Sequence, residues 1–212
     1  KLPDIVDFAR TYLGVDPVTQ PMPVQPTAHY TMGGIPTNRY GEAVIDENNM
    51  VMPGLYAAGE VACVSVHGAN RLGTNSLLDL IVFGKHAGLR AAAFANGSDF
   101  QSLPDDPTDF AREQFERIRT AEGNEKILDV SNAMRYVMSD GVGMFRTGEG
   151  MQVALDTVRG LKERYRHIPL TDKGRIFNTD MMNIWELGNL LDLAEMITIA
   201  ALARTESRGA HA

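Results

Sequence analysis

A turn rich in glycine and asparagine runs directly into an apolar helix at residues 67–80, with the sequence HGANRLGTNSLLDL. Glycines let the backbone of such a turn bend sharply and approach a ligand closely. A helix start leaves backbone N–H groups without intrahelical acceptors and carries partial positive charge, so it favours an anion or an electron-rich ring edge. Arg71 is a planar, permanently charged donor suited to a carboxylate. The stretch predicts an anion pocket at the end of a buried helix; the alternatives are that Arg71 pairs with a structural aspartate and that the turn is only a helix cap.

The helix that follows this turn is predicted to span residues 76–96. Ser76 and Asp79 have the spacing of a capping box, and Asn96 with Gly97 supplies the opposite end. Apolar residues at 77, 78 and 80–83 leave the helix almost no polar face. We therefore expect it to be buried on most of its sides.

The residues before the turn predict a short helix, a connector and a small β region. Residues 3–13 have the apolar spacing of a helix, and the segment DPVTQPMPVQP that follows is typical of a connector between packed units. From Thr27 to Glu60, short strand-like segments alternate with the turn signals GGIPTN, DENN and PG.

Residues 99–212 predict only helices. One is expected to open at Asp106–Pro107, with proline at its first position, and the last, from about Met181 to Leu202, is apolar nearly all round and is expected at the centre. The apolar stripes between them comprise Phe110, Ala111, Phe115 and Ile118; Ile127, Val130, Met134, Val137 and Met138; and Met151, Leu155, Val158, Leu161 and Tyr165. We interpret these stripes as the core of an antiparallel helical bundle with short polar loops.

Composition excludes several classes of function. The chain of 212 residues has a formal charge of −7 and no cluster of basic and aromatic residues, which argues against a nucleic-acid surface. Its only cysteine, Cys63, rules out an internal disulfide and a thiolate metal site. The longest apolar run, residues 77–94, is interrupted by four charged or histidine residues and is too polar for a membrane span.

Three ordered blocks, HYTMGGIPTN, GLYAAGEVACVSV and HGANRLGTNSLLDLIVFGKHAG, resemble the flavoprotein subunits of succinate dehydrogenase and fumarate reductase, and the resemblance continues to TESRGAHA at residues 205–212. It implies an α+β fold with part of an FAD-binding domain, short strands plus a buried helix, followed by an antiparallel helical bundle. The expected divisions are the end of a capping domain and a connector at 1–24, the C-terminal part of the FAD-binding domain at 25–98, and a helical domain at 99–212.

The resemblance also implies roles for individual residues. His29 and Arg71 correspond to positions that bind the carboxylates of the substrate, and Thr74, where relatives often carry glycine or alanine, to a substrate contact through the backbone. Glu60, Ser76 and Leu77 correspond to positions that contact FAD, the last two through their N–H groups. We expect no metal ligands.

Each of these residues also has a plainer interpretation. His29 could be a hydrogen-bonded histidine at a strand end, and Glu60 a surface carboxylate. His67 either caps the turn or faces the flavin. Arg204, Arg208 and His211 belong to a family motif of undefined task, for which the simpler explanation is a helix C-terminus that attracts cations.

The function implied by the resemblance is oxidation of succinate to fumarate. The protein would then be an oxidoreductase of the tricarboxylic acid cycle and of electron transport. Electrons would pass from FAD to an iron–sulfur partner subunit and on to quinone, with membrane anchor subunits held indirectly. The subunit would be peripheral, on the cytoplasmic face of the inner membrane or on the mitochondrial matrix side in a eukaryote. Alternatives are a fumarate reductase, an L-aspartate oxidase, or a catalytically silent helical docking module.

The family's GxGxxG fingerprint, its flavin-linking histidine and its proton-accepting arginine have no counterpart in these residues. We therefore expect no proton-transferring catalytic residue here and read the chain as an internal segment of a longer one. Residues 25–98 would then pack against a Rossmann sheet that is not here, so the apolar helix at 76–96 is also expected to be partly exposed in this chain alone.

Overall fold

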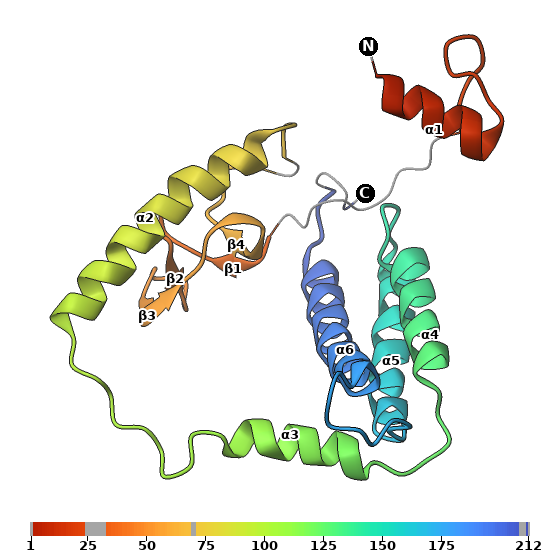
Figure 1. Ribbon diagram of the computed structural model, residues 1–212. Coiled ribbons are helices and arrows are strands. Elements are labelled where there is room, and N and C mark those ends of the chain that lie inside the picture. Colours follow the sequence, from red (N-terminus) through yellow and green to blue (C-terminus); the bar gives the residue numbers. More distant parts are fainter. Residues whose placement is uncertain (1, 24–32, 69–70, 208–210, 212) are drawn as a thin grey trace. The chain divides into compact units, whose positions relative to one another are not determined.

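The computed structural model describes residues 2–23, 33–68, 71–207 and 211. The chain divides into two compact units, one of residues 1–65 with 76–91 and the other of residues 66–75 with 92–212. Short strands lie in the first unit, and four helices make up most of the second (Figure 1). The structure thus confirms the α+β class predicted from the sequence.

The first unit opens with the predicted N-terminal helix, α1 (Pro3–Leu13). Proline stands at its start, where the missing N–H costs no hydrogen bond. The helix ends at Gly14, whose φ of 65° gives the left-handed conformation common after a helix.

The described part of the β region contains two small sheets. Strands β1 (Ile35–Pro36) and β4 (Ala62–Cys63) pair in parallel, and β2 (Glu42–Val44) and β3 (Val51–Tyr56) form an antiparallel pair. A short 3₁₀ helix, η1 (Gly59–Val61), precedes β4. Two glycines allow this region to touch helix α2 (Asn75–Gly97): a Cβ at Gly41 would lie 2.6 Å from that of Ala87, and one at Gly59 would lie 2.3 Å from Leu80 Cδ2.

Helix α2 differs from its prediction at its start. It begins at Asn75, and the preceding Thr74 has a left-handed backbone and makes no side-chain cap. The predicted capping box is wrong because Ser76 already lies inside the helix. The hydroxyl of Thr74 instead donates to the Gly73 carbonyl at 2.6 Å.

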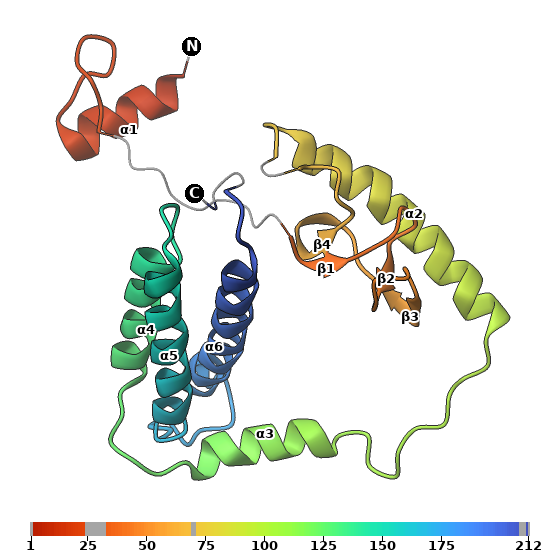
Figure 2. The ribbon, with the colours of Figure 1, turned by 180° about the vertical axis from the view of Figure 1, so that it is seen from behind.

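The burial predicted for α2 is also wrong within this structure. Only Asp79 and Ala87 are buried, whereas Leu77 is 61% exposed and Ile81 69% exposed. The strands lie along one side of the helix (Figures 1 and 2) and cover little of its apolar surface. The partial exposure expected for this chain alone is therefore what the structure shows.

The second unit contains α3 (Asp109–Thr120), α4 (Ile127–Gly141), α5 (Gly148–Tyr165) and α6 (Thr179–Ala203). Helices α4, α5 and α6 lie side by side with alternating directions, and α3 crosses one end of them (Figures 1 and 2). This arrangement confirms the antiparallel bundle. Helix α3 begins two residues after the predicted start because the Asp106 carboxylate accepts hydrogen bonds from the N–H and hydroxyl of Thr108.

The core of the bundle follows one stripe of α6. Its six buried residues recur every three or four positions, as expected for a helix seam; they are Ile184, Leu187, Leu191, Ala194, Thr198 and Ala201. They pack against buried residues of α4 and α5 that include Val130 and Val158. The prediction of a central helix holds in that α6 contacts α3, α4 and α5. Its outer face remains exposed, however, because Leu193 and Met196 lie more than half in solvent.

Ion pairs connect the helices and loops of the bundle. Arg164 donates two hydrogen bonds to the Glu125 carboxylate, at 2.8 and 2.7 Å. Glu195 of α6 accepts from Arg159 and Lys162 of α5, at 2.8 and 2.7 Å. The Glu195 contacts join α5 to α6, and the Glu125 contacts join α5 to the loop before α4, by charge-assisted bonds in addition to the apolar core.

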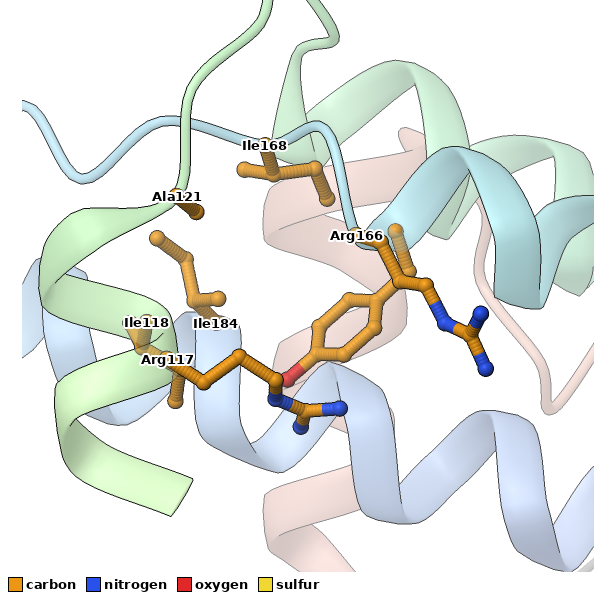
Figure 3. A pocket seen from close by; sticks show the side chains of 7 residues that line it. Arg117, Ile118, Ala121, Arg166, Ile168 and Ile184 are labelled. Atoms are coloured by element: carbon orange, nitrogen blue, oxygen red, sulfur yellow. The ribbon is translucent and has the colours of Figure 1, made fainter. Parts of the chain in front are cut away.

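A small depression lies where α3, α5 and α6 meet (Figure 3). Its lining is mainly apolar, with Ile118, Ile168 and Ile184, and two arginine side chains extend past it, Arg117 and Arg166. Tyr165 also lines it, and its hydroxyl lies so close to α6 that a Cβ at Gly188 would be 2.7 Å away. Burial raises the pKa of this hydroxyl. The depression is thus a packing detail of the bundle.

Candidate functional site at the start of helix α2

The first turn of α2 presents backbone donors. Thr74, the N-cap residue, makes no side-chain cap, and the N–H groups of Ser76 and Leu77 in the first turn have no intrahelical acceptor. Leu77 is exposed and Ser76 half-buried. The turn therefore offers two adjacent N–H donors together with the positive end of a 23-residue helix.

The backbone of Thr74 is unusual in a way that suits a contact through the main chain. Its φ of 69° and ψ of −16° are in the left-handed region, which a threonine enters at a cost of about 1–3 kcal/mol. The N–H of Asn75 turns back to the Leu72 carbonyl at 3.2 Å. Residues 72–75 therefore form a tight turn with the Thr74 side chain exposed.

Arg71 precedes this turn by three residues and is half-buried. Connectivity alone keeps it within about 10 Å of the Thr74 backbone. A half-buried guanidinium is less screened by water than an exposed one, so its interaction with a carboxylate is stronger. The structure thus keeps both substrate-contact candidates of the turn, Arg71 and Thr74, directly before the helix start.

Glu60 approaches α2 from the strand region. The preceding Gly59, with φ of 77°, has no room for a side chain because Leu80 occupies that space. Leu80 lies one helical turn after Ser76, so η1 touches the beginning of α2. Glu60 is exposed beside this contact, and its side chain makes interactions within the chain.

His29, the other predicted substrate ligand, lies outside the described residues. The chain is described again from Gly33, and a Cβ at Gly34 would come within 2.3 Å of the Val61 carbonyl oxygen. The parallel pairing of Ile35 with Ala62 continues that contact. Gly34 and β1 therefore lie beside Val61 and β4, directly after Glu60 in the chain.

Two further candidates, His67 and His211, have contacts in the structure. His67, like Arg71, makes interactions within the chain, and the alternative roles proposed for it remain predictions. At the C-terminal end, His211 lies with Nδ1 3.1 Å from an Arg146 guanidinium nitrogen and with Nε2 3.0 Å from the Arg204 carbonyl oxygen. Sequence reasoning missed Arg146, which nothing in its local pattern FRTGEG distinguishes. Arg208 lies outside the described residues.

These residues fit a flavin. An uncapped helix start offers N–H donors to the carbonyl and nitrogen acceptors of the ring edge, and the close contact at Gly59 leaves Glu60 exposed beside the same end of the helix. Ser76 and Leu77 would hold the ring edge, and Glu60 would contact the cofactor from the strand side.

Comparison with known proteins agrees with this arrangement. The sequence model described as "FAD binding domain" matches residues 1–77, and the one described as "Fumarate reductase flavoprotein C-term" matches residues 131–212. The first covers α1, the strands and the start of α2, and the second covers most of the bundle. The match confirms the prediction of FAD as the cofactor.

Whole-chain comparisons identify the same relatives. The chain is 42% identical to the succinate dehydrogenase flavoprotein subunit of Rickettsia bellii and 43% identical to the fumarate reductase flavoprotein subunit of Proteus vulgaris, in both cases over its full length. It also resembles a solved E. coli quinol fumarate reductase, with 40% identity over 99% of the chain and a TM-score of 0.88.

The combined matches define an FAD-binding flavoprotein segment followed by a helical domain. The chain belongs to the family of succinate dehydrogenase and fumarate reductase flavoprotein subunits, as the three sequence blocks predicted. It spans about a third of the length of these relatives, 36% of the Rickettsia subunit, 34% of the Proteus subunit and 35% of the E. coli chain.

Proposed function

We propose that the full-length protein is an FAD-dependent enzyme that interconverts succinate and fumarate, with succinate oxidation as its main direction. One observation carries the proposal: the Arg71 turn joins an uncapped helix start in a chain about 42% identical throughout to enzymes named for these two substrates. FAD, when bound, supplies the acceptor for two electrons.

The chain's own residues would bind and polarise the substrate. Arg71 and His29 would each hold a carboxylate, and the Thr74 backbone would contact the same molecule. Removal of a proton beside a carboxylate builds negative charge, which a fixed guanidinium and a positive helix end stabilise more than they stabilise the resting substrate. The N–H groups of Ser76 and Leu77 would act in the same way on the ring edge of the cofactor.

The partners and location follow from the same proposal. Electrons would pass to an iron–sulfur subunit and on to quinone, with membrane anchor subunits bound indirectly and this subunit peripheral. Within the described residues, every helix is either too short or too polar to span a bilayer. The division into a capping-domain end, part of an FAD-binding domain and a helical domain, with limits at residues 24 and 98, remains a proposal.

Arg71 offers the direct test. In the full-length protein, Arg71→Ala is expected to lower kcat/KM for succinate by about 100-fold or more, because a misplaced or missing charge stabiliser has effects of that size. Arg71→Lys should recover only part of the loss, since a lysine cannot form the planar fork. FAD content, measured by absorbance, should be unchanged in both variants.

Arg135→Ala is the matched control, because Arg135 is an exposed arginine in the bundle. It should turn over at the normal rate. Normal turnover of Arg71→Ala would contradict the assignment of the site. Steady-state rates of succinate oxidation and of fumarate reduction in the same preparation would establish the preferred direction. Oxidation of L-aspartate in place of succinate would support the alternative of an L-aspartate oxidase.

A further inference from the structure

Two glycines of the β region contact the same face of α2. Gly41 packs closely on Ala87, and the space beside Gly59 is occupied by the Cδ2 atom of Leu80. Leu80 and Ala87 are two helical turns apart, so they lie on one face of α2 and roughly 10 Å from each other along its axis. The β region therefore rests on α2 at two points, one near the start of the helix and one near its middle.

Hydrogen bonds hold the backbone that joins these two points. The N–H of Ala57, a buried residue, donates to the Gly41 carbonyl at 2.9 Å. Gly59 follows two residues later and begins η1, where its carbonyl accepts from the N–H of Ala62. Both glycines have a left-handed backbone, with φ of 76° at Gly41 and 77° at Gly59. The backbone at Gly59 is therefore a fixed support for the side chain of Leu80.

The contact at Gly59 connects the two groups of residues that are proposed to hold the flavin. On the strand side, Glu60 follows Gly59 directly in the chain. On the helix side, Leu80 lies one turn after Ser76 and Leu77, whose N–H groups are the proposed donors to the ring edge. Any change in how Leu80 sits on Gly59 would therefore alter the separation between Glu60 and the start of α2.

We propose that Leu80 is a positioning residue for FAD, because its contact with Gly59 sets the distance between Glu60 and the N–H donors of the first turn of α2. Fixed donors stabilise negative charge on a ring edge only when they are aimed at it. Leu80 acts through these residues and has no polar atom of its own to offer the cofactor. The inference rests on the proposed function and on its assignment of Glu60, Ser76 and Leu77 to FAD.

The test uses the full-length protein with FAD bound. Leu80→Ala empties the space beside Gly59, and Gly59→Ala pushes the Leu80 side chain aside. Both substitutions should lower the midpoint potential of the flavin, because reduction adds negative charge that misdirected N–H donors stabilise less well. The kcat for succinate oxidation should fall by about tenfold to 100-fold. Leu80→Met keeps the side-chain volume, so its potential should stay close to that of the unsubstituted protein.

Gly41→Ala is the matched control. It places a methyl group against the same helix from a backbone of nearly the same φ, but the contact is with Ala87, two turns beyond Leu80. Its thermal unfolding temperature should fall by an amount similar to that of Gly59→Ala, whereas its flavin potential should be unchanged. A purely structural role for Leu80 predicts instead that the potential follows the unfolding temperature in every variant.

An unchanged or higher potential in Leu80→Ala, or an equal shift in Gly41→Ala, would overturn the proposal. Flavin absorbance and succinate–fumarate turnover of the unsubstituted protein, measured in parallel, separate this result from a failure of the proposed function. If the unsubstituted protein has both, the proposed function holds whether or not Leu80 positions the cofactor. If it lacks either, the proposed function fails, and the role of Leu80 fails with it.

Discussion

Helices α2 and α6 are both apolar over most of their surface, yet they are buried to very different degrees. Helix α6 buries a continuous stripe from Ile184 to Ala201 against its neighbours, whereas α2 buries only Asp79 and Ala87. The difference lies in the surroundings: within the part of the chain that the structure describes, α6 has α3, α4 and α5 beside it, whereas α2 is touched by the short β region at Gly41 and Gly59. An apolar helix sequence therefore predicts that the helix will be buried, but it does not identify the elements that will cover it.

The largest expected effect is in the core of α6. Leu191→Ala should destabilise the bundle by about 2–5 kcal/mol, because Leu191 has an exposed fraction of 0% and the substitution leaves a cavity. Urea unfolding followed by fluorescence of Trp185, the only tryptophan of the chain, would measure the loss.

Leu193→Ala is the matched control within the same helix, since Leu193 is 52% exposed. Its effect should stay within about 0.5 kcal/mol. Equal losses for the two substitutions would show that the outer face of α6 is also packed in solution, and the contrast with α2 would then disappear.

The sequence predicted the bundle better than it predicted the start of α2. The stripe containing Val130 and Met134 identified α4 because its packing partners are other stripes of the same chain. The start of α2 was misplaced because Ser76 and Asp79 imitate a capping box, while the left-handed backbone of Thr74 leaves no sign in the sequence.

At the start of α2, local sequence predicted the turn and the apolar helix but not the elements that touch them. The turn at 67–74 and the helix start were recognisable from glycine, arginine and a following apolar run. The contact of Gly59 with Leu80, which carries Glu60 to α2, joins residues 21 positions apart and depends on the strand pairing. Such long-range contacts have no local signature.

A smaller effect is expected where the strands meet α2. Gly59→Ala should cost about 1–3 kcal/mol locally, because the new Cβ would collide with Leu80 and the backbone has a φ of 77°. Amide hydrogen exchange should speed up in β3 and in the first turns of α2.

Gly14→Ala provides the control. The φ of Gly14 is similar, at 65°, but nothing lies within 4 Å of the new methyl group, so only backbone strain remains. If both substitutions accelerate exchange only at their own positions, the contact between η1 and α2 does not stabilise either element.

The smallest effect concerns the ion pairs that join α5 to α6. Hydrogen bonds from Arg159 and Lys162 hold the pKa of Glu195 below its ordinary value. A carboxylate whose pKa is lower in the folded state stabilises the fold above its unfolded pKa of about 4.3, and this contribution disappears as the pH falls through the lowered value. Glu195→Gln should therefore reduce the free energy of unfolding at pH 7 by about 0.5–1 kcal/mol, and the reduction should shrink as the pH falls through the lowered pKa.

The comparison with Glu186→Gln isolates the ion pair, because Glu186 is an exposed carboxylate of the same helix and the substitution changes the net charge equally. Urea midpoints of both variants, measured by Trp185 fluorescence between pH 3 and pH 7, should converge only for Glu195→Gln. A constant difference across that range would mean that Glu195 acts on α6 through packing and not through its charge. The contact between α5 and α6 would then depend mainly on the buried stripe, and α2 has no such stripe in this chain.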